Sequence, residues 1–170
     1  MRSIGTERRR WTGAKLAGVL IASVIGGAGL PAMAGEIIIH IDRVRALDRI
    51  DPTTSPDFFA QLTVGGQVFK TQRIKNAVEI RPSWVITATV PRGVTPVNFA
   101  ILDNNVLKKD ELIDVNRLDN KRDLDFRVDT RSCQILDFSQ SYRCRDRITR
   151  GGAEKKAAEV TFRVEVRRRR

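Results

Sequence analysis

The segment Trp84-Val85-Ile86-Thr87-Ala88-Thr89-Val90 is the clearest indication that this chain forms β-strands. It is built from β-branched, aromatic and small apolar residues, which suit a pleated and half-buried strand. Successive side chains of a strand point to opposite sides, so Trp84, Ile86 and Ala88 share one face. Pro91 follows and ends the strand. We therefore expect a strong strand here, with Trp84 as an anchor in or beside the hydrophobic core.

Similar patterns lie on both sides of this segment. Ile37, Ile39 and Ile41 alternate with other residues, as in a strand with one apolar face. Gly65-Gly66 has the composition of a two-residue hairpin turn. The predicted strands are 36–42, 59–64, 67–71, 84–90, 97–102, 112–115, 124–128 and 158–166. Residues 153–159 favour a helix but form only a short run. The pattern predicts an all-β protein, an eight-stranded antiparallel β-sandwich.

The first 34 residues have the three parts of a secretory signal peptide. Basic residues between Arg2 and Lys15 precede an apolar run over 16–30, and the small-residue site Ala32-Met33-Ala34 follows the helix breaker Pro31. A membrane-spanning helix needs roughly 20 apolar residues, and this run is shorter and rich in glycine. We expect residues 1–34 to be cleaved, as in a bacterial-type exported protein that is periplasmic or extracellular.

The charge of the remaining chain favours an anionic partner. The sequence has 31 Lys and Arg against 20 Asp and Glu, a net charge of +11. Five of the basic residues and one acidic residue lie in the predicted leader, which leaves +7. We expect one domain over 35–166 and a disordered basic tail over 167–170. Lipid headgroups or another acidic surface are the expected partners, and export argues against nucleic acid. No feature identifies a protein partner.

The two cysteines, Cys133 and Cys144, both follow the predicted leader. In an exported chain, an even number of cysteines close in sequence predicts a disulfide bond. With only one histidine beside them, they argue against a zinc site. We expect them to close an excursion between the last two predicted strands.

No set of residues suggests catalysis. The chain has no Gly-x-Ser-x-Gly segment, no P-loop and no metalloprotease motif, and the single histidine, His40, is predicted on the outer face of a strand. We therefore expect a protein that is not an enzyme. Two acidic loops, 47–59 and 103–110, remain. Their carboxylates and amides suit calcium, which takes six to eight oxygen ligands, but Asp and Asn are also ordinary turn formers. Composition alone leaves both interpretations open.

Three segments, in order, resemble elements of the C2 domain, the calcium- and phospholipid-binding β-sandwich. Residues 50–62 resemble the first calcium loop of that family and the strand after it. Arg81-Pro82-Ser83-Trp84 resembles the Asn-Pro-x-Trp element that enters the fourth strand. Residues 97–110 resemble the strand that leads into the third calcium loop. The resemblance covers about residues 36–115 and implies a C2-type sandwich whose first strand runs directly into the first calcium loop.

The resemblance also implies a set of metal ligands. By position, the first loop would supply Asp51 and Asp57, with Asp48 as an outside candidate. The third loop would supply Asp103, Asn105 and Asp110. Asn105 stands where the family usually has Asp, and Lys108 and Lys109 would repel the ion. We therefore expect weak calcium binding, which is still of use to exported modules that work at roughly 10⁻⁴–10⁻³ M.

The tip of the third loop implies contact with a membrane. Val106 and Leu107 are apolar and would enter the headgroup region, while Lys108 and Lys109 would meet anionic lipid. Lys70, Arg73 and Lys75 lie on and after the third predicted strand, where some relatives carry a basic lipid patch.

The expected function is that of an exported, non-enzymatic binding module, with calcium-assisted binding to an anionic membrane or cell surface. The alternative is a metal-free structural or adhesive β-sandwich that binds a protein or a glycan.

Overall fold

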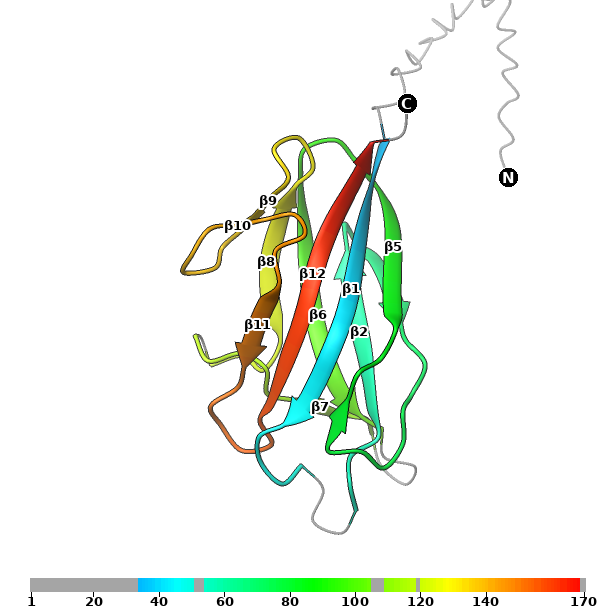
Figure 1. The fold of residues 1–170 in the computed structure, drawn as a ribbon, viewed down its shortest axis with the longest axis vertical. Helices are drawn as coiled ribbons and strands as arrows, with labels where there is room; N and C mark the ends of the chain where they lie inside the picture. Colours follow the sequence, from blue (N-terminus) through cyan, green and yellow to red (C-terminus); the bar gives the residue numbers. More distant parts are fainter. Residues whose placement is uncertain (1–33, 51–53, 105–108, 119, 169–170) are drawn as a thin grey trace, which may run out of the picture. The chain divides into compact units, whose positions relative to one another are not determined.

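The protein is an antiparallel β-sandwich (Figure 1). The computed structural model describes residues 34–50, 54–104, 109–118 and 120–168, and within these residues all regular structure is strand. The strands are β1 (Ala34–Ala46), β2 (Phe58–Val64), β3 (Gln67–Lys70), β4 (Glu79–Ile80), β5 (Trp84–Pro91), β6 (Val94–Asp103), β7 (Glu111–Ile113), β8 (Leu124–Asp129), β9 (Gln134–Leu136), β10 (Tyr142–Arg143), β11 (Ile148–Gly151) and β12 (Ala158–Arg168). No helix among the described residues is long and apolar enough to cross a membrane.

The first sheet is built around the long pair β1 and β12. These strands run antiparallel from Gly35 opposite Arg168 to Ala46 opposite Ala158, with an irregularity between Ile41 and Arg43. β11 pairs with the free side of β12. The other edge of β1 is shared, because β5 pairs with its first part and β4 with its end. β1 is followed directly by the β1–β2 connection, the loop that resembles the first calcium loop of the family, as the resemblance implied.

The second sheet has the order β10-β9-β8-β6-β2-β3. β6 is the central strand, since β2 covers one edge and β8 and then β7 cover the other. Gly65 and Gly66 form the turn between β2 and β3, with φ of 55° and 85°. Such positive φ values are those of a two-residue hairpin turn, which glycine adopts without steric cost.

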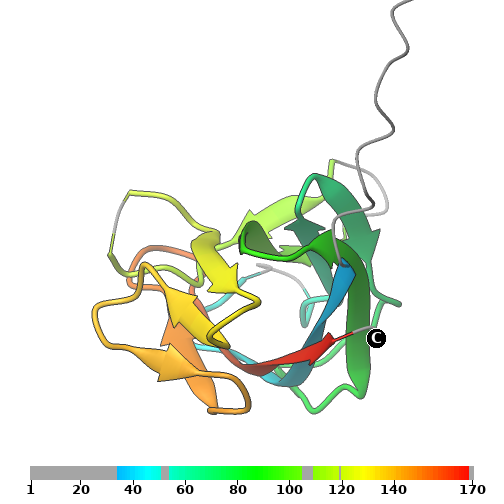
Figure 2. The same ribbon diagram turned by 90° about the horizontal axis from the view of Figure 1, so that it is seen from above.

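The core lies between the two sheets, which Figure 2 shows from above. β5 alternates buried and exposed residues along its whole length. Trp84 is 9% exposed and stands opposite Ile41 in the ladder, so its predicted place at the core is confirmed. Phe99 of β6 and Phe162 of β12 meet across the sandwich, with ring centroids 5.0 Å apart. Apolar burial on this scale is the main term that stabilises the fold.

The predicted fold class is confirmed, and every predicted strand is present. The structure adds β4, β9, β10 and β11, which are two to four residues long. Residues 153–156 are turns and irregular chain rather than a helix, and β12 begins at Ala158. β12 also runs on to Arg168, so the first half of the predicted tail belongs to the sheet. The predicted leader lies outside the described residues, apart from Ala34 at the start of β1.

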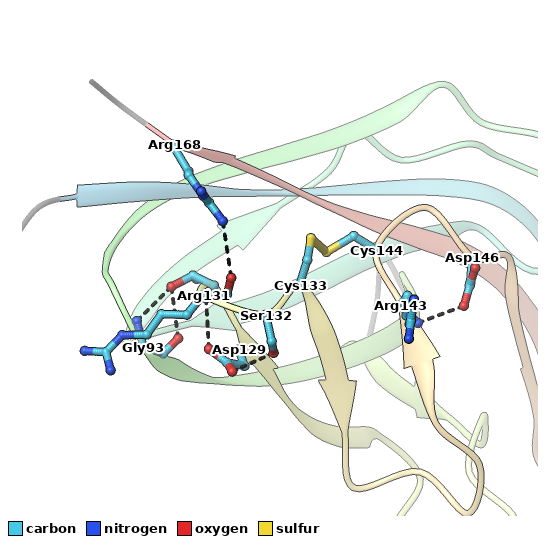
Figure 3. The surroundings of a disulfide bond; sticks show 10 residues. Gly93, Asp129, Arg131, Ser132, Cys133, Arg143, Cys144, Asp146 and Arg168 are labelled. Carbon is cyan, nitrogen blue, oxygen red and sulfur yellow. Dashed lines mark hydrogen bonds between the residues drawn. A yellow bond between two sulfur atoms is a disulfide. The ribbon is translucent and has the colours of Figure 1, made fainter.

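The predicted disulfide between Cys133 and Cys144 is confirmed, with Cα atoms 5.3 Å apart (Figure 3). It closes the β9–β10 hairpin, which lies between β8 and β11 at the edge of the second sheet. The Cys144 N–H also donates to the Cys133 carbonyl at 2.9 Å. The hairpin is therefore joined both covalently and through the backbone.

Candidate functional site at the loop end

Three connections meet where β1 and β6 end, and we call this part of the molecule the loop end (Figure 1). They are the β1–β2, β3–β4 and β6–β7 connections, which cover residues 47–57, 71–78 and 104–110. They lie close together because Phe58 at the start of β2 pairs with Asp103 at the end of β6. Phe58 also forms a bridge to Ile74. The topology of the sandwich thus joins loops that are far apart in sequence.

Asp57 and Asp103, two predicted metal ligands, are in direct contact. The Asp57 N–H donates to Oδ1 of Asp103 at 2.7 Å, and the Asn104 N–H donates to the Asp57 carbonyl at 3.0 Å. Asp103 is only 3% exposed. A buried carboxylate is costly unless it is hydrogen-bonded, so this exchange of bonds fixes the two loops against each other.

Arg73 of the β3–β4 connection brings a positive charge to this pair. Its Nη1 lies 3.7 Å from Oδ2 of Asp57 and donates a hydrogen bond to Oδ1 of Asn104. The other carboxylate oxygen of Asp57 accepts the Asn76 N–H at 2.9 Å. The Arg73 guanidinium therefore neutralises the charge of Asp57 from within the chain.

Asp110 joins the same network through Asn104, which donates from Nδ2 to Oδ1 of Asp110 at 2.6 Å. Asn104 thus accepts from Arg73 and donates to Asp110. The sequence pattern missed Asn104 as a member of this network, and it placed Arg73 in a lipid patch rather than beside a carboxylate. Neither role has a local signal, because both depend on which loops the fold brings together.

Calcium binding at this site would depend partly on residues that lie outside the described part of the chain. Asp51, Asn105, Val106, Leu107 and Lys108 lie outside the described residues. Within the described part of the chain, no group of three or more acidic, histidine or cysteine side chains is arranged to hold a metal ion. Of the predicted ligands, three lie in the described part of the chain: Asp57, Asp103 and Asp110. Each of them has a carboxylate oxygen that already accepts a hydrogen bond. The five predicted ligands therefore stay a prediction, with Asp51 and Asn105 needed to complete the set.

The remaining basic residues of the predicted surface are exposed. Of the four residues of the predicted membrane contact, Lys109 is the one that lies in the described part of the chain, and it is exposed. Lys70 lies with Nζ 5.8 Å from the centre of the Phe59 ring, and Lys75 is exposed two positions after Arg73 in the chain. Lys70, Lys75 and Lys109 are therefore accessible to an anionic partner, whereas Arg73 is engaged.

A second buried carboxylate, Asp114, ties the β11–β12 connection to the loop end. Asp114 is 1% exposed, and its Oδ2 accepts the N–H groups of Ala153 and Glu154, both at 2.8 Å. A Cβ on Gly152 would lie 2.3 Å from the Asp114 carbonyl oxygen and 2.4 Å from Oδ2. Only glycine fits this approach. Asp114 thus holds a connection in place, a structural role that the sequence pattern did not predict.

The chain belongs to the C2 domain family, whose profile matches residues 20–135, more than half of its length. This is the family that the three sequence segments resembled. The match is consistent with the observed sandwich and with the meeting, at one end, of the two loops that resemble the first and third calcium loops of the family. No curated protein matches the chain.

Several solved structures share the fold. A calcium-bound pair of C2 domains from extended synaptotagmin 2 aligns with a TM-score of 0.55 and 15% identity, over 81% of this chain and 47% of that one. A single C2 domain of plant extended synaptotagmin 1 gives 0.54 and 9%, over 80% and 96%. Human GIVD cytosolic phospholipase A2 gives 0.55 and 13%, over 83% of this chain but only 17% of the enzyme. At such identities the likeness shows the fold alone.

Proposed function

We propose that this protein is an exported, non-enzymatic binding module whose loop end docks on an anionic membrane surface with the help of calcium. The observation that carries the proposal is the network of Asp57, Asp103, Asn104 and Asp110. It joins the first and third calcium loops of a C2 domain. The calcium-bound structure of a similar fold supports the same chemistry.

The chemistry follows from the residue types. Calcium prefers carboxylate and carbonyl oxygens in a flexible shell, and the ligands here would be Asp51, Asp57, Asp103, Asn105 and Asp110. A bound calcium ion supplies positive charge at the surface that anionic headgroups approach. Val106 and Leu107 would add apolar contact, and Lys108 and Lys109 would add about 1 kcal/mol each beside an anionic surface.

Weak affinity is expected, because two features oppose the ion. The Arg73 guanidinium already lies beside Asp57, and calcium would have to compete with it. Lys109 is an exposed cation of the same loop as Asp110. The affinity should therefore fall in the millimolar range of exported modules, about 10⁻⁴–10⁻³ M.

Sedimentation with anionic vesicles tests this function. The protein is mixed with phosphatidylcholine vesicles that contain phosphatidylglycerol, in chelator or in millimolar calcium. Calcium should increase the bound fraction, and Asp57→Asn should remove that increase. Glu154→Gln is the matched control, because it also removes one negative charge, from an exposed residue of the β11–β12 connection, and should leave the increase intact. An identical bound fraction with and without calcium would exclude the calcium-assisted function.

One observation favours the alternative, a metal-free structural or adhesive sandwich. Arg73 supplies an internal cation to the loops through Asp57 and Asn104, so the loop end can be held together without a metal. If calcium changes neither vesicle binding nor thermal stability, this alternative replaces the calcium-assisted function.

A further inference from the structure

The end of the sandwich opposite the loop end carries six exposed arginines from four separate parts of the chain. We call it the arginine end. Arg92 lies in the β5–β6 turn, and Arg131 follows β8. Arg143 and Arg145 lie at the end of the β9–β10 hairpin and just after it, and Arg167 and Arg168 end β12. Since β1 and β12 start and finish at opposite ends of the same ladder, these arginines lie far from the calcium loops.

Specific contacts hold these segments together. Thr130 and Gly93 exchange hydrogen bonds, including Thr130 N–H to the Gly93 carbonyl at 2.9 Å, which joins the turns that carry Arg92 and Arg131. Arg168 donates to the Arg131 carbonyl at 3.4 Å (Figure 3). The disulfide fixes the segment of Arg143 and Arg145 beside that of Arg131. The cluster is therefore built by the fold rather than by a single run of sequence.

Two acidic residues of this end are committed to local bonds, and a third, Glu36, lies opposite Arg167 in the β1–β12 ladder. Asp129 accepts the Ser132 hydroxyl at 2.6 Å and the Arg131 N–H at 2.9 Å, and the Ser132 bond is the main cause that lowers the pKa of Asp129. Asp146 accepts the Arg143 N–H at 2.7 Å. Asp129 and Asp146 thus accept bonds from neighbouring backbone and hydroxyl groups, and the guanidinium groups of Arg143 and Arg145 form no ion pair within the described part of the chain.

The type of cation indicates the partner. The segments of the arginine end contain no lysine, whereas Lys70, Lys75, Lys109 and Lys156 lie elsewhere in the fold. Arginine has a planar fork of donors that matches phosphate oxygens in a bidentate manner. Binding of single-stranded nucleic acid uses exposed aromatic rings, and no aromatic side chain is exposed in the described residues of this end. Val94, close to Arg92, is instead an exposed aliphatic side chain at 53%, which suits a headgroup layer.

We propose that the arginine end is a second docking surface, which binds the phosphate groups of an anionic phospholipid bilayer without calcium. β12 spans the sandwich from Ala158 to Arg168, about 33 Å at the rise of a strand. With the loop end on one bilayer and the arginine end on another, one molecule can bridge two membranes. The second surface goes beyond the proposed function, since it uses none of the loop-end residues.

Vesicle sedimentation in chelator tests the surface directly. The triple variant Arg131→Gln, Arg143→Gln, Arg145→Gln is compared with the control Lys121→Gln, Arg127→Gln, Arg163→Gln, which removes the same charge from the β7–β8 connection, β8 and β12, outside the arginine end. Each basic residue near an anionic surface is worth about fivefold in affinity. The arginine-end variant should therefore bind phosphatidylglycerol vesicles about 100-fold more weakly, and the control should lose much less. Equal losses in the two variants would overturn the proposal.

Three further readouts separate the outcomes. The calcium-induced increase in vesicle binding should survive in the arginine-end variant, because the loop end is intact there. A wild-type protein that shows no such increase would contradict the loop-end function alone and would leave the test of the arginine end unaffected. Light scattering should show clustering of vesicles by the wild type in calcium, and none by the arginine-end variant. Unchanged vesicle binding by this variant, together with lost retention on an acidic polysaccharide column, would assign the surface to a glycan and overturn the bilayer proposal. Unchanged melting temperatures check that both variants are folded.

Discussion

The Arg73 guanidinium lies 3.7 Å from the Asp57 carboxylate, within the loops that define a C2 domain. The Arg73 side chain is 32% exposed and that of Asp57 is 17% exposed. The pair is therefore partly shielded from water, and its attraction exceeds that of a fully exposed pair. A positive charge from the chain thus occupies the neighbourhood in which calcium would need carboxylate oxygens. In the proposed function, calcium would have to compete with Arg73 for Asp57.

Removing Arg73 should increase the affinity for calcium. We expect Arg73→Gln to lower the calcium concentration that half-saturates the rise in melting temperature by about fivefold, since an ion pair of this kind is worth on the order of 1 kcal/mol. The measurement is thermal unfolding across a calcium titration, because an ion that binds the folded state raises its melting temperature.

The neighbouring exposed cation provides the control for this variant. Lys75→Gln removes the same charge two positions along the chain and should shift the titration much less. Equal shifts in Arg73→Gln and Lys75→Gln would show that only the general charge of the loop end matters. The specific competition between Arg73 and calcium would then be wrong.

Truncating Trp84 should destabilise the sandwich strongly. Trp84 is 9% exposed, and the next residue, Val85, is 55% exposed. Trp84→Ala should lower the free energy of unfolding by about 3–5 kcal/mol, whereas Val85→Ala on the solvent side should change it by about 0.5 kcal/mol or less. Urea unfolding of both variants gives the comparison. Similar midpoints for the two would remove Trp84 from the core.

The alternation in 84–90 predicted β5 well, because burial on one face imposes a period of two over its eight residues. β4 and β10 have two residues each, which is too short to show any period. Residues 153–156 contain helix formers, but Asp114 and the backbone of Ala153 and Glu154 fix them as an irregular segment. A long-range contact overrode a local preference there.

The candidate site was predictable only in its residue types. The acidic composition of the two loops indicated a place for carboxylates, and the pairing of β2 with β6 brings Asp57 to Asp103 as the resemblance implied. The contact of Arg73 with Asp57 depends on the path of the β3–β4 connection, which carries no periodic signal. For the same reason the sequence did not predict the role of Asn104, whose side chain has hydrogen-bond partners in two different loops.

Adding a methyl group at Gly152 should disrupt the buried Asp114. The new Cβ would lie 2.3 Å from the Asp114 carbonyl oxygen, so the backbone must move and the bonds to Ala153 and Glu154 must weaken. We expect Gly152→Ala to cost about 1–3 kcal/mol of stability. Gly151→Ala is the control, because its nearest neighbour is the end of the exposed Leu47 side chain at 3.3 Å. If the two variants unfold alike, Gly152 has no special steric role.

Removing the disulfide should lower stability without abolishing the fold. Cys133 and Cys144 are separated by 11 positions, and closing a loop of this length contributes about 2–3 kcal/mol in the chain-entropy model. The doubly substituted Cys133→Ser, Cys144→Ser protein should keep its far-ultraviolet circular dichroism and melt at a lower temperature. Because the bond holds Arg143 and Arg145 near Arg131, this variant should also bind anionic vesicles more weakly in chelator. Loss of all cooperative unfolding would contradict the peripheral position of the hairpin.

The bond from Ser132 to Asp129 should make part of the stability depend on pH. The Ser132 hydroxyl, and then the Arg131 N–H, lower the pKa of Asp129 below its ordinary value of 3.8. A carboxyl whose pKa is lower in the folded state stabilises that state above the ordinary pKa, and the contribution is lost as the pH falls through the folded value. The difference in melting temperature between wild type and Ser132→Ala should therefore be constant above about pH 5 and should shrink below about pH 4. Ser141→Ala, at an exposed serine of the same hairpin, should show no such trend. Carboxyl-carbon NMR should find the pKa of Asp129 higher in Ser132→Ala, and an unchanged value would show that the Ser132 hydroxyl does not stabilise the charged form.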